Sequence, residues 1–378
     1  MQRVVVLGAG FGGLELTSVL AEEFAGDVDV VLIDRTEGFV FGFSKLDVMF
    51  GRTSPEQVFH PYADLVKPGV TFVRAEITAI DPAAKRVETT AGSFEGDALV
   101  IALGAEYDVA RTPGLAEAGH DFYSEAGAFA LQRTLAEFGG GDVVIGITAG
   151  PFKCPPAPSE AALLLDELLR ARGIRDRSSI SLVMPFPRPI PPSPDASSAL
   201  LAAFEERGIA WIPDRSVRSL DTDTRTVRLG DGSALPFDLF LGVPVHRVPD
   251  VVRESGLTVD GWVPVDSRTL ETSWPGVYAV GDVAAVGTPK AGVFAERQAA
   301  AAARRIAAHL RSAAADAEYD GHGTCYVEFG GGEVGVVDVS FFDGRPHGTL
   351  LGPGPQYATD KAEFGRSRIR RWFGREWE

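Results

Sequence analysis

The sequence has 378 residues, of which 45% are hydrophobic, and a formal net charge of −16. This length fits two or three domains with sizeable cores, and the acidic balance argues against nucleic acid as a partner, because phosphate binding needs a basic surface. No apolar run of about 18 residues is present, and no secretory signal precedes the first predicted strand, so we expect a cytoplasmic protein.

The N-terminal residues carry a dinucleotide-binding pattern. Residues 3–7 predict a buried strand, the glycine-rich residues 8–13 follow directly, and residues 14–24 have helical periodicity. A second apolar strand, 28–33, ends at Asp34. Strand, glycine turn, helix, strand and acid in this order are typical of a dinucleotide site.

The residue types of this pattern have separate roles. Gly8 allows the tight turn, Gly10 lets the backbone approach a pyrophosphate, and Gly13 lets helix and strand pack closely. Asp34 is expected to bind ribose hydroxyls. The next segment, residues 39–50, is rich in phenylalanine, which favours core packing, and the alternative is that its aromatic rings lie near a flat cofactor ring.

A weak internal repeat follows. Residues 87–105 predict strand, turn and strand, and residues 227–242 repeat this pattern at an offset of 140 residues (227 − 87). We therefore expect two related nucleotide-type domains. In the second one, the strand at 142–147 lacks a full glycine fingerprint after it, and the strand at 181–184 ends in a proline-rich loop, residues 185–194, instead of an acid. Loss of pyridine-nucleotide binding is the inference.

Cys154 occupies a stiff loop just before a predicted helix. Three prolines follow it within four residues, and Lys153 precedes it. A helix N-terminus and a neighbouring cation both favour a thiolate, so we expect an activated cysteine. The only other cysteine is Cys325, and a pair of cysteines in a reducing compartment is more often catalytic, metal-binding or incidental than a structural disulfide.

Residues 277–310 contain a second set of features suited to a cofactor site. A strand at 277–280 stops at Gly281-Asp282, and Lys290 opens an alanine-rich helix that runs to about residue 310. A helix N-terminus and this lysine would together stabilise negative charge on a reduced ring. Packing alone is the other explanation of this helix.

The C-terminal region predicts antiparallel strands at 324–329 and 333–342 and then a basic, aromatic tail, residues 361–378. The tail reads as an amphipathic helix, which suits either a membrane surface or docking on the acidic body of its own subunit or of a twin subunit. Peripheral membrane contact and a homodimer both stay open on this pattern.

Taken together, the motifs resemble the sulfide:quinone oxidoreductase and flavocytochrome c sulfide dehydrogenase branch of the flavin disulfide reductase superfamily. The resemblance is carried by residues 8–13, Asp34, residues 102–105, residues 153–160, residues 278–282, residues 290–292 and residues 325–328. The Lys-Cys-Pro-Pro-Ala-Pro loop with the late Cys-Tyr-Val-Glu is the specific part of this resemblance.

The resemblance implies FAD as cofactor and a redox-active disulfide between Cys154 and Cys325 on one face of the flavin. It implies Glu160 as a proton carrier and Lys290 as a group that stabilises reduced flavin. Sulfide would attack the disulfide, and a quinone would accept two electrons. Since the chain has only two cysteines, we expect no covalent link between cysteine and flavin, and no metal.

The expected fold is α/β, with two Rossmann-like domains of the glutathione-reductase type and a small C-terminal α+β region. Residues 1–112 and 247–315 are expected to bind FAD, 113–246 to form an NAD(P)H-like domain with a degenerate nucleotide site, and 316–378 to supply the second cysteine. The residues expected at FAD are Gly8, Gly10, Phe11, Gly12, Gly13, Asp34, Arg35, Ile77, Ala102, Gly104, Gly281, Asp282, Lys290 and Gly292.

Three alternatives stay open. The chain would be an NAD(P)H:quinone or NAD(P)H:acceptor dehydrogenase of the same fold if the second domain kept its nucleotide. It would be the flavoprotein subunit of a sulfide dehydrogenase if its acceptor were a cytochrome. It would be a non-catalytic flavoprotein, serving as a sulfur carrier or assembly partner, if no quinone supported turnover.

Overall fold

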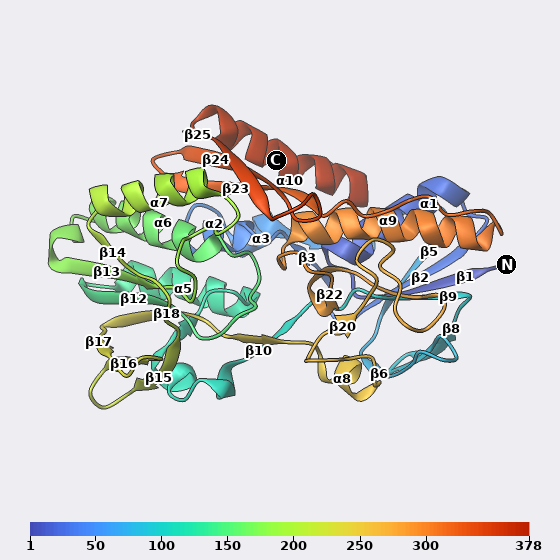
Figure 1. The fold of residues 1–378 in the computed structure, drawn as a ribbon, viewed down its shortest axis with the longest axis horizontal. Coiled ribbons are helices and arrows are strands. Elements are labelled where there is room, and N and C mark those ends of the chain that lie inside the picture. The colour runs from blue at the N-terminus through green and yellow to red at the C-terminus, as the bar shows by residue number, and fades with distance from the viewer. Residues whose placement is uncertain (378) are drawn as a thin grey trace.

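The computed structural model describes residues 1–377. The molecule is elongated, with one parallel sheet in each half and the C-terminal segment lying across the top of both halves (Figure 1). This arrangement confirms the expected α/β fold with two Rossmann-like sheets. Within the described residues, no helix combines the length and the apolar character that crossing a bilayer requires.

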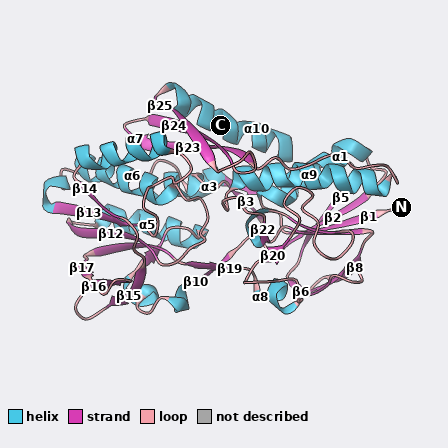
Figure 2. Ribbon diagram, in the orientation of Figure 1, coloured by secondary structure: helices cyan, strands magenta, loops and turns pink. Residues whose placement is uncertain are grey.

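The first sheet is parallel, with strand order β21-β9-β1-β2-β5. Its strands are β1 (Arg3–Leu7), β2 (Asp29–Asp34), β5 (Val70–Arg74), β9 (Ala98–Ile101) and β21 (Val277–Ala279). Helices α1 (Phe11–Phe24) and α9 (Gly292–Leu310) lie against each other beside this sheet (Figure 2). Because β21 and α9 come from late in the chain, two distant segments together build the half that carries the glycine turn.

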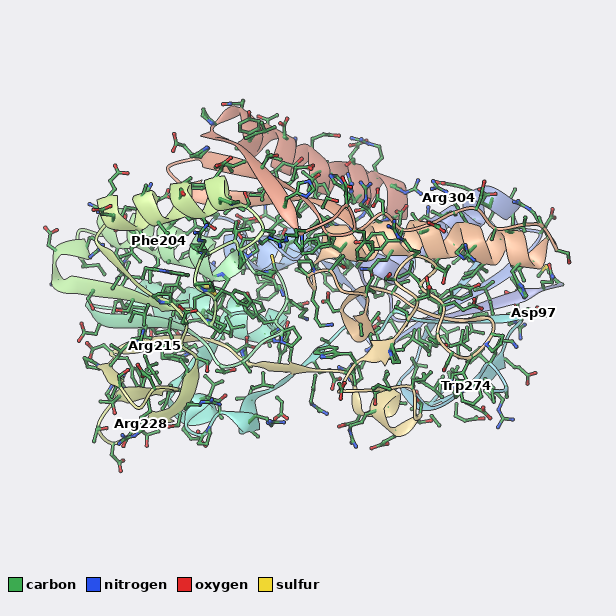
Figure 3. The ribbon with its side chains drawn as sticks, viewed as in Figure 1. Asp97, Phe204, Arg215, Arg228, Trp274 and Arg304 are labelled. Carbon is green, nitrogen blue, oxygen red and sulfur yellow. The ribbon has the colours of Figure 1, made fainter. Side chains whose placement is uncertain are left out.

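The second sheet is also parallel, with strand order β11-β18-β12-β13-β14. Its strands and helices are β11 (His120–Asp121), β12 (Gly141–Ile147), β13 (Ser178–Val183), β14 (Ile209–Ile212), β18 (Leu239–Val243), α5 (Glu125–Glu137), α6 (Ala157–Ala171) and α7 (Pro194–Glu206). Phe204 of α7 (Figure 3) stacks on Trp211 of β14 with ring centroids 6.0 Å apart. This contact fixes the helix on the edge of the sheet.

The internal repeat is present in three dimensions. Two antiparallel three-stranded sheets have the orders β6-β7-β8 and β15-β16-β17. Their strands are β6 (Ile77–Asp81), β7 (Arg86–Thr89), β8 (Gly92–Glu95), β15 (Val217–Asp221), β16 (Thr226–Leu229) and β17 (Ala234–Pro236). Val87 and Val227 occupy the central strands, and both are fully buried. The chain crosses between the halves twice, and the crossings pair as β10 (Glu106–Asp108) with β19 (Val245–Arg247).

The C-terminal region is an antiparallel sheet covered by one helix. It contains β23 (His322–Gly330), β24 (Glu333–Ser340), β25 (His347–Gly354) and α10 (Gln356–Phe373). The third strand, β25, was not predicted from the sequence. Shorter elements are β3 (Gly38–Val40), β4 (Phe59–Pro61), β20 (Val263–Pro264), β22 (Ala284–Ala285), α2 (Ser44–Met49), α3 (Pro55–Val58), α4 (Leu115–Ala118), α8 (Asp250–Glu254) and the 3₁₀ turns Tyr62–Asp64, Val109–Arg111, Arg175–Arg177 and Gly281–Val283.

The tail docks on its own subunit. Trp372 is fully buried, and its indole N–H donates to Glu15 Oε2 over 2.8 Å. Arg371 forms ion pairs with Glu15 (2.8 Å) and Glu22 (2.7 Å). The apolar face of α10 is therefore covered by protein, as the docking interpretation of the tail expects, and peripheral membrane contact stays a prediction. A homodimer stays a prediction.

The phenylalanine-rich segment belongs to the same contact. Phe41 is fully buried, lies edge-on to Phe11 with ring centroids 4.9 Å apart, and stacks on Trp372 at an interplanar angle of 13°. Phe43 is only half-buried and tilts against Phe41. Core packing is therefore the role of Phe41, because its two faces are occupied by protein rings.

Trp372→Ala is expected to lower the free energy of unfolding by about 3–5 kcal/mol, because it opens a large cavity and leaves the Glu15 carboxylate without one of its donors. The measurement is chemical denaturation of wild type and variant. Trp274→Ala is the matched control, since this indole is 40% exposed (Figure 3) and its loss should change stability little. Equal losses in both variants would contradict the docked tail.

Candidate active site

Cys154 lies in the loop between β12 and α6, where the two halves meet. Its backbone N–H donates to the carbonyl oxygen of Lys290 over 2.7 Å, and its own carbonyl accepts a hydrogen bond from the Tyr123 hydroxyl over 3.3 Å. Its φ of +47° is a left-handed conformation that few residues other than glycine adopt. Backbone strain of this kind concentrates at functional sites. Lys290 and Tyr123 belong to different halves of the molecule, so both halves hold the loop in place.

Cys325 reaches the same region from β23. Helix α6 packs against β23, and the backbone N–H of Glu328 donates to Glu160 Oε1 over 3.0 Å. Cys325 is three residues before Glu328 on this strand. Burial is the main cause that raises the pKa of both thiols, the charge of Glu160 raises both further, and Cys325 also raises the pKa of Cys154. The fold therefore brings together three side chains that are far apart in the sequence.

The expected thiolate at Cys154 is not what the structure favours. Both cysteines are free thiols, and burial is the main cause that raises the pKa of Cys325 to about 12. The Cys154 residue is exposed to solvent, yet many protein atoms surround its thiol. This burial, together with the charge of Glu160, raises the pKa of the thiol strongly. The Lys153 ammonium points away, donating to the Ala105 carbonyl over 3.1 Å.

Glu160 is the titratable group of this cluster. Its side chain is buried, with 3% exposure, and burial raises its pKa to about 7 despite the opposing charge of Lys361. A carboxyl with this pKa exchanges a proton near neutral pH, as a general base or acid requires. Its role as proton carrier remains a prediction, which its position beside both thiols favours.

Lys290 is oriented by backbone groups. Its ammonium donates to the carbonyl oxygens of Asp282 (2.5 Å) and Ala284 (3.3 Å) and lies 3.4 Å from the ring centroid of Trp262. Burial lowers its pKa to about 8. These contacts already occupy the Lys290 ammonium, so the clearest link between Lys290 and the thiols is the hydrogen bond that its backbone carbonyl accepts from the Cys154 N–H. The role of Lys290 at a reduced ring stays a prediction.

The sequence did not reveal an ion cluster behind Glu160. The Glu328 carboxylate pairs with Lys361 and with Arg52 Nη1, the latter over 2.6 Å, and Arg52 also pairs with Asp47 over 3.3 Å. Lys361 is only 7% exposed. No local pattern connects residues 52, 328 and 361, so only the tertiary structure identifies them.

The glycine turn fits a pyrophosphate. A Cβ at Gly13 would lie 1.8 Å from the Gly8 carbonyl oxygen, and a Cβ at Gly8 would lie 2.5 Å from the Ala102 carbonyl oxygen, so both positions need glycine. A Cβ at Gly10 would meet no described protein atom within 4 Å, which leaves open space beside the start of α1. That helix has no side-chain cap and no acid in its first turn, so its free N–H groups suit phosphate oxygens.

The other predicted FAD residues gather at one edge. Most follow the carboxyl ends of β1, β2, β9 and β21, where dinucleotides bind in open α/β sheets; they include Gly12, Ala102, Gly104, Gly281 and Asp282. Asp34 Oδ2 accepts from the Ala9 N–H over 2.7 Å. Arg35 is exposed and pairs with Glu106, and Ile77 begins β6 close to the end of β5.

Two further observations concern Gly292 and Asp282, which were predicted to contact FAD. A Cβ at Gly292 would lie 2.7 Å from the Phe11 ring, so the starts of α1 and α9 need this small residue to approach each other. Burial raises the pKa of Asp282, and among the described residues none donates a hydrogen bond to its carboxylate. A half-buried carboxylate without a protein donor suits a ligand hydroxyl. The assignment of each residue to FAD remains a proposal.

Gly10→Ala is expected to weaken FAD binding by at least about tenfold while the protein still folds, because the added methyl meets no protein atom but fills space that a phosphate needs. Fluorescence titration of apoprotein with FAD measures the affinity. Gly139→Ala is the matched control, since a Cβ there also meets nothing within 4 Å and the residue lies far along the chain from the turn. Unchanged FAD affinity in Gly10→Ala would contradict this cradle.

The fold and the glycine turn define a dinucleotide-dependent oxidoreductase. The pyridine nucleotide-disulphide oxidoreductase family matches residues 2–304. The chain belongs to this family, and it is an FAD-dependent enzyme.

Several known proteins are similar to this chain. The mitochondrial sulfide:quinone oxidoreductase of Schizosaccharomyces pombe is 27% identical over 373 residues, covering 90% of this chain and 81% of its own length. The solved sulfide:quinone oxidoreductase of Aquifex aeolicus has a TM-score of 0.85 at 23% identity, covering 98% of this chain and 92% of that one. A type II NADH:quinone oxidoreductase of Staphylococcus saprophyticus subsp. saprophyticus is 33% identical over 138 residues, covering 36% of this chain and 34% of its own.

Proposed function

We propose that this enzyme oxidises sulfide through a redox disulfide between Cys154 and Cys325 and passes two electrons to a quinone. One observation carries this proposal: α6 and β23 pack so that Glu160, buried between them, acts on both thiols. A relative that matches 90% of the chain bears the name of this activity.

The sulfur chemistry balances without another reactant. Hydrosulfide attacks the disulfide, a new S–S bond forms at one cysteine, and the other cysteine leaves as a thiolate. Glu160 takes one proton from hydrogen sulfide, which generates this hydrosulfide. FAD, when bound, supplies the two-electron step that links the thiol pair to the quinone.

One cavity of the structure suits the quinone. It has a volume of about 340 Å³ and lies beside α10, where Phe43, Trp377 and the ion cluster residue Lys361 line it. Aromatic rings suit a flat ring, and Lys361, which pairs with Glu328, places a positive charge beside a developing quinol oxyanion. Electrons would therefore enter from the thiol side and leave toward α10.

An NADH-dependent reaction is the second candidate. A type II NADH:quinone oxidoreductase matches about a third of this chain. The segment after β12 is the proline-rich Cys154 loop instead of a glycine fingerprint, and β13 is followed by proline instead of an acid or arginine. These replacements disfavour a nicotinamide nucleotide in the second half.

Anaerobic mixing of the FAD-loaded enzyme with sulfide and, separately, with NADH decides between them. Rapid bleaching of the flavin by sulfide, with NADH slower by at least about 10²-fold, is the expected result. Fast bleaching by NADH with no response to sulfide would overturn the proposed function and favour the second candidate.

A further inference from the structure

The two lysines that adjoin Cys154 through the backbone have other partners for their ammonium groups. The Lys153 ammonium donates to the Ala105 carbonyl over 3.1 Å and lies 4.5 Å from the ring centroid of Tyr107. The Lys290 ammonium is bonded to two backbone carbonyls and covers an indole ring. Neither ammonium is among the main charges that act on the Cys154 thiol, so neither explains how a thiolate would be stabilised there.

A third lysine, Lys45, approaches the Cys154 loop from the first half of the molecule. It lies in the first turn of α2, which packs against α5 of the second half. Its ammonium donates to the backbone carbonyl of Tyr123, and the Tyr123 hydroxyl donates to the Cys154 carbonyl over 3.3 Å. A single tyrosine therefore binds both the ammonium and the loop that carries the cysteine.

Tyr123 is fixed by packing on several sides. The residue is only 5% exposed, and the rings of Phe152 and His246 meet its ring edge-on, with centroids 6.5 Å and 5.6 Å away. Its carbonyl also accepts a hydrogen bond from the Tyr107 hydroxyl over 2.8 Å. Because this intermediate is held rigidly, the position of the Lys45 ammonium relative to the cysteine loop is held as well.

The charge of Lys45 acts on one thiol of the pair. Besides burial, Glu160, Cys325 and Asp282 raise the pKa of the Cys154 thiol, and Lys45 is the one cation among the main charges that lowers it. Lys45 is not among the causes that act on the Cys325 thiol. An opposite charge nearby favours the ionised form of a group, so this lysine distinguishes the two sulfurs.

We propose that Lys45 is a positioning residue of the thiol pair, which holds the Cys154 loop through Tyr123 and stabilises a thiolate at Cys154 in preference to one at Cys325. This deepens the proposed function, and its value for turnover rests on that function, because opening a disulfide leaves one sulfur as a thiolate. A cation near a cysteine favours the thiolate over the thiol. The cation comes from α2 and not from the lysine that adjoins Cys154 in sequence.

The test measures how fast iodoacetamide alkylates Cys154 and Cys325 in the reduced, FAD-loaded enzyme, by mass spectrometry of the two peptides. In Lys45→Met the ratio of the Cys154 rate to the Cys325 rate should fall about threefold, because a roughly tenfold loss of thiolate is partly offset by the higher nucleophilicity of a more basic sulfur. Lys45→Glu reverses the charge and should lower the ratio about tenfold by the same reasoning. Lys45→Arg should keep the wild-type ratio.

Lys67 supplies the matched control. Its ammonium also donates to a backbone carbonyl, that of Arg371, over 2.8 Å, and its charge is not among the main causes acting on either thiol. Lys67→Met should therefore keep the wild-type ratio. A ratio that falls equally in all three Lys45 variants, or in none of them, would overturn the assignment, because a purely structural role does not follow charge. Sulfide that leaves the wild-type flavin oxidised would overturn the proposed function alone, since alkylation involves no sulfide.

Discussion

Cys325→Ala is expected to slow the bleaching of the flavin by sulfide by at least about 10³-fold, the size of loss seen when one member of a catalytic unit is removed. Without the second thiol no disulfide forms, so hydrosulfide has no S–S bond to attack. FAD content should stay near that of the wild type, because this residue lies outside the predicted cradle. Stopped-flow absorbance under anaerobic conditions measures the rate.

The two cysteines should behave as one unit. Cys154→Ala and the double variant are expected to be about as slow as Cys325→Ala, because removing either partner already abolishes the disulfide, and such effects do not add. Bleaching of Cys325→Ala at the wild-type rate would exclude the paired mechanism. A double variant far slower than both single variants would mean that each thiol acts on its own.

Glu160→Gln is expected to slow sulfide-dependent flavin reduction by about 10²-fold above pH 8, within the usual range for loss of a general base. The folded-state pKa of about 7 means that this carboxyl is protonated below that pH and ionised above it. The ratio of wild-type to variant rates should therefore be close to one below about pH 6 and rise with a midpoint near pH 7. Taking the ratio cancels the ionisation of sulfide itself, which is common to both enzymes.

The same helix supplies the control for this experiment. Glu167 also lies on α6, and its Oε2 accepts from the Gly331 N–H over 3.0 Å, much as Glu160 accepts from Glu328. Glu167 is exposed, and its charge is not among the main causes acting on either thiol. Glu167→Gln should keep the wild-type profile. A flat ratio for Glu160→Gln across this pH range would remove Glu160 from the proton step.

Local patterns predicted much of the fold. The turn at Gly8 and Gly13 is readable because those positions exclude a side chain whatever surrounds them, and the repeat is readable because strand, turn and strand recur at a fixed offset. The Cys154 loop is readable because its prolines restrict the backbone. By contrast, β25 was missed, since the alternation of its residues is weak and pairing with β24 supplies its stability.

The contacts and charge partners of side chains were harder to predict than the course of the backbone. The tail pattern of aromatic and basic residues fits a lipid surface and an acidic protein surface equally well, and only the positions of Glu15 and Glu22 reveal the docking on its own subunit. Lys153 adjoins Cys154 in sequence, yet its ammonium donates to the Ala105 carbonyl, and the cation that acts on the thiol is the distant Lys45.

The sequence by itself determined a dinucleotide turn, a repeated domain plan and two cysteines in a setting suited to redox chemistry, because these depend on steric requirements and residue identity over short stretches. The tertiary structure decided that burial raises the pKa of Glu160 to about 7, that burial also raises the pKa of both thiols, and that an apolar cavity adjoins Cys325. Desolvation and long-range charge set these properties, and both depend on which distant residues the fold packs around each group.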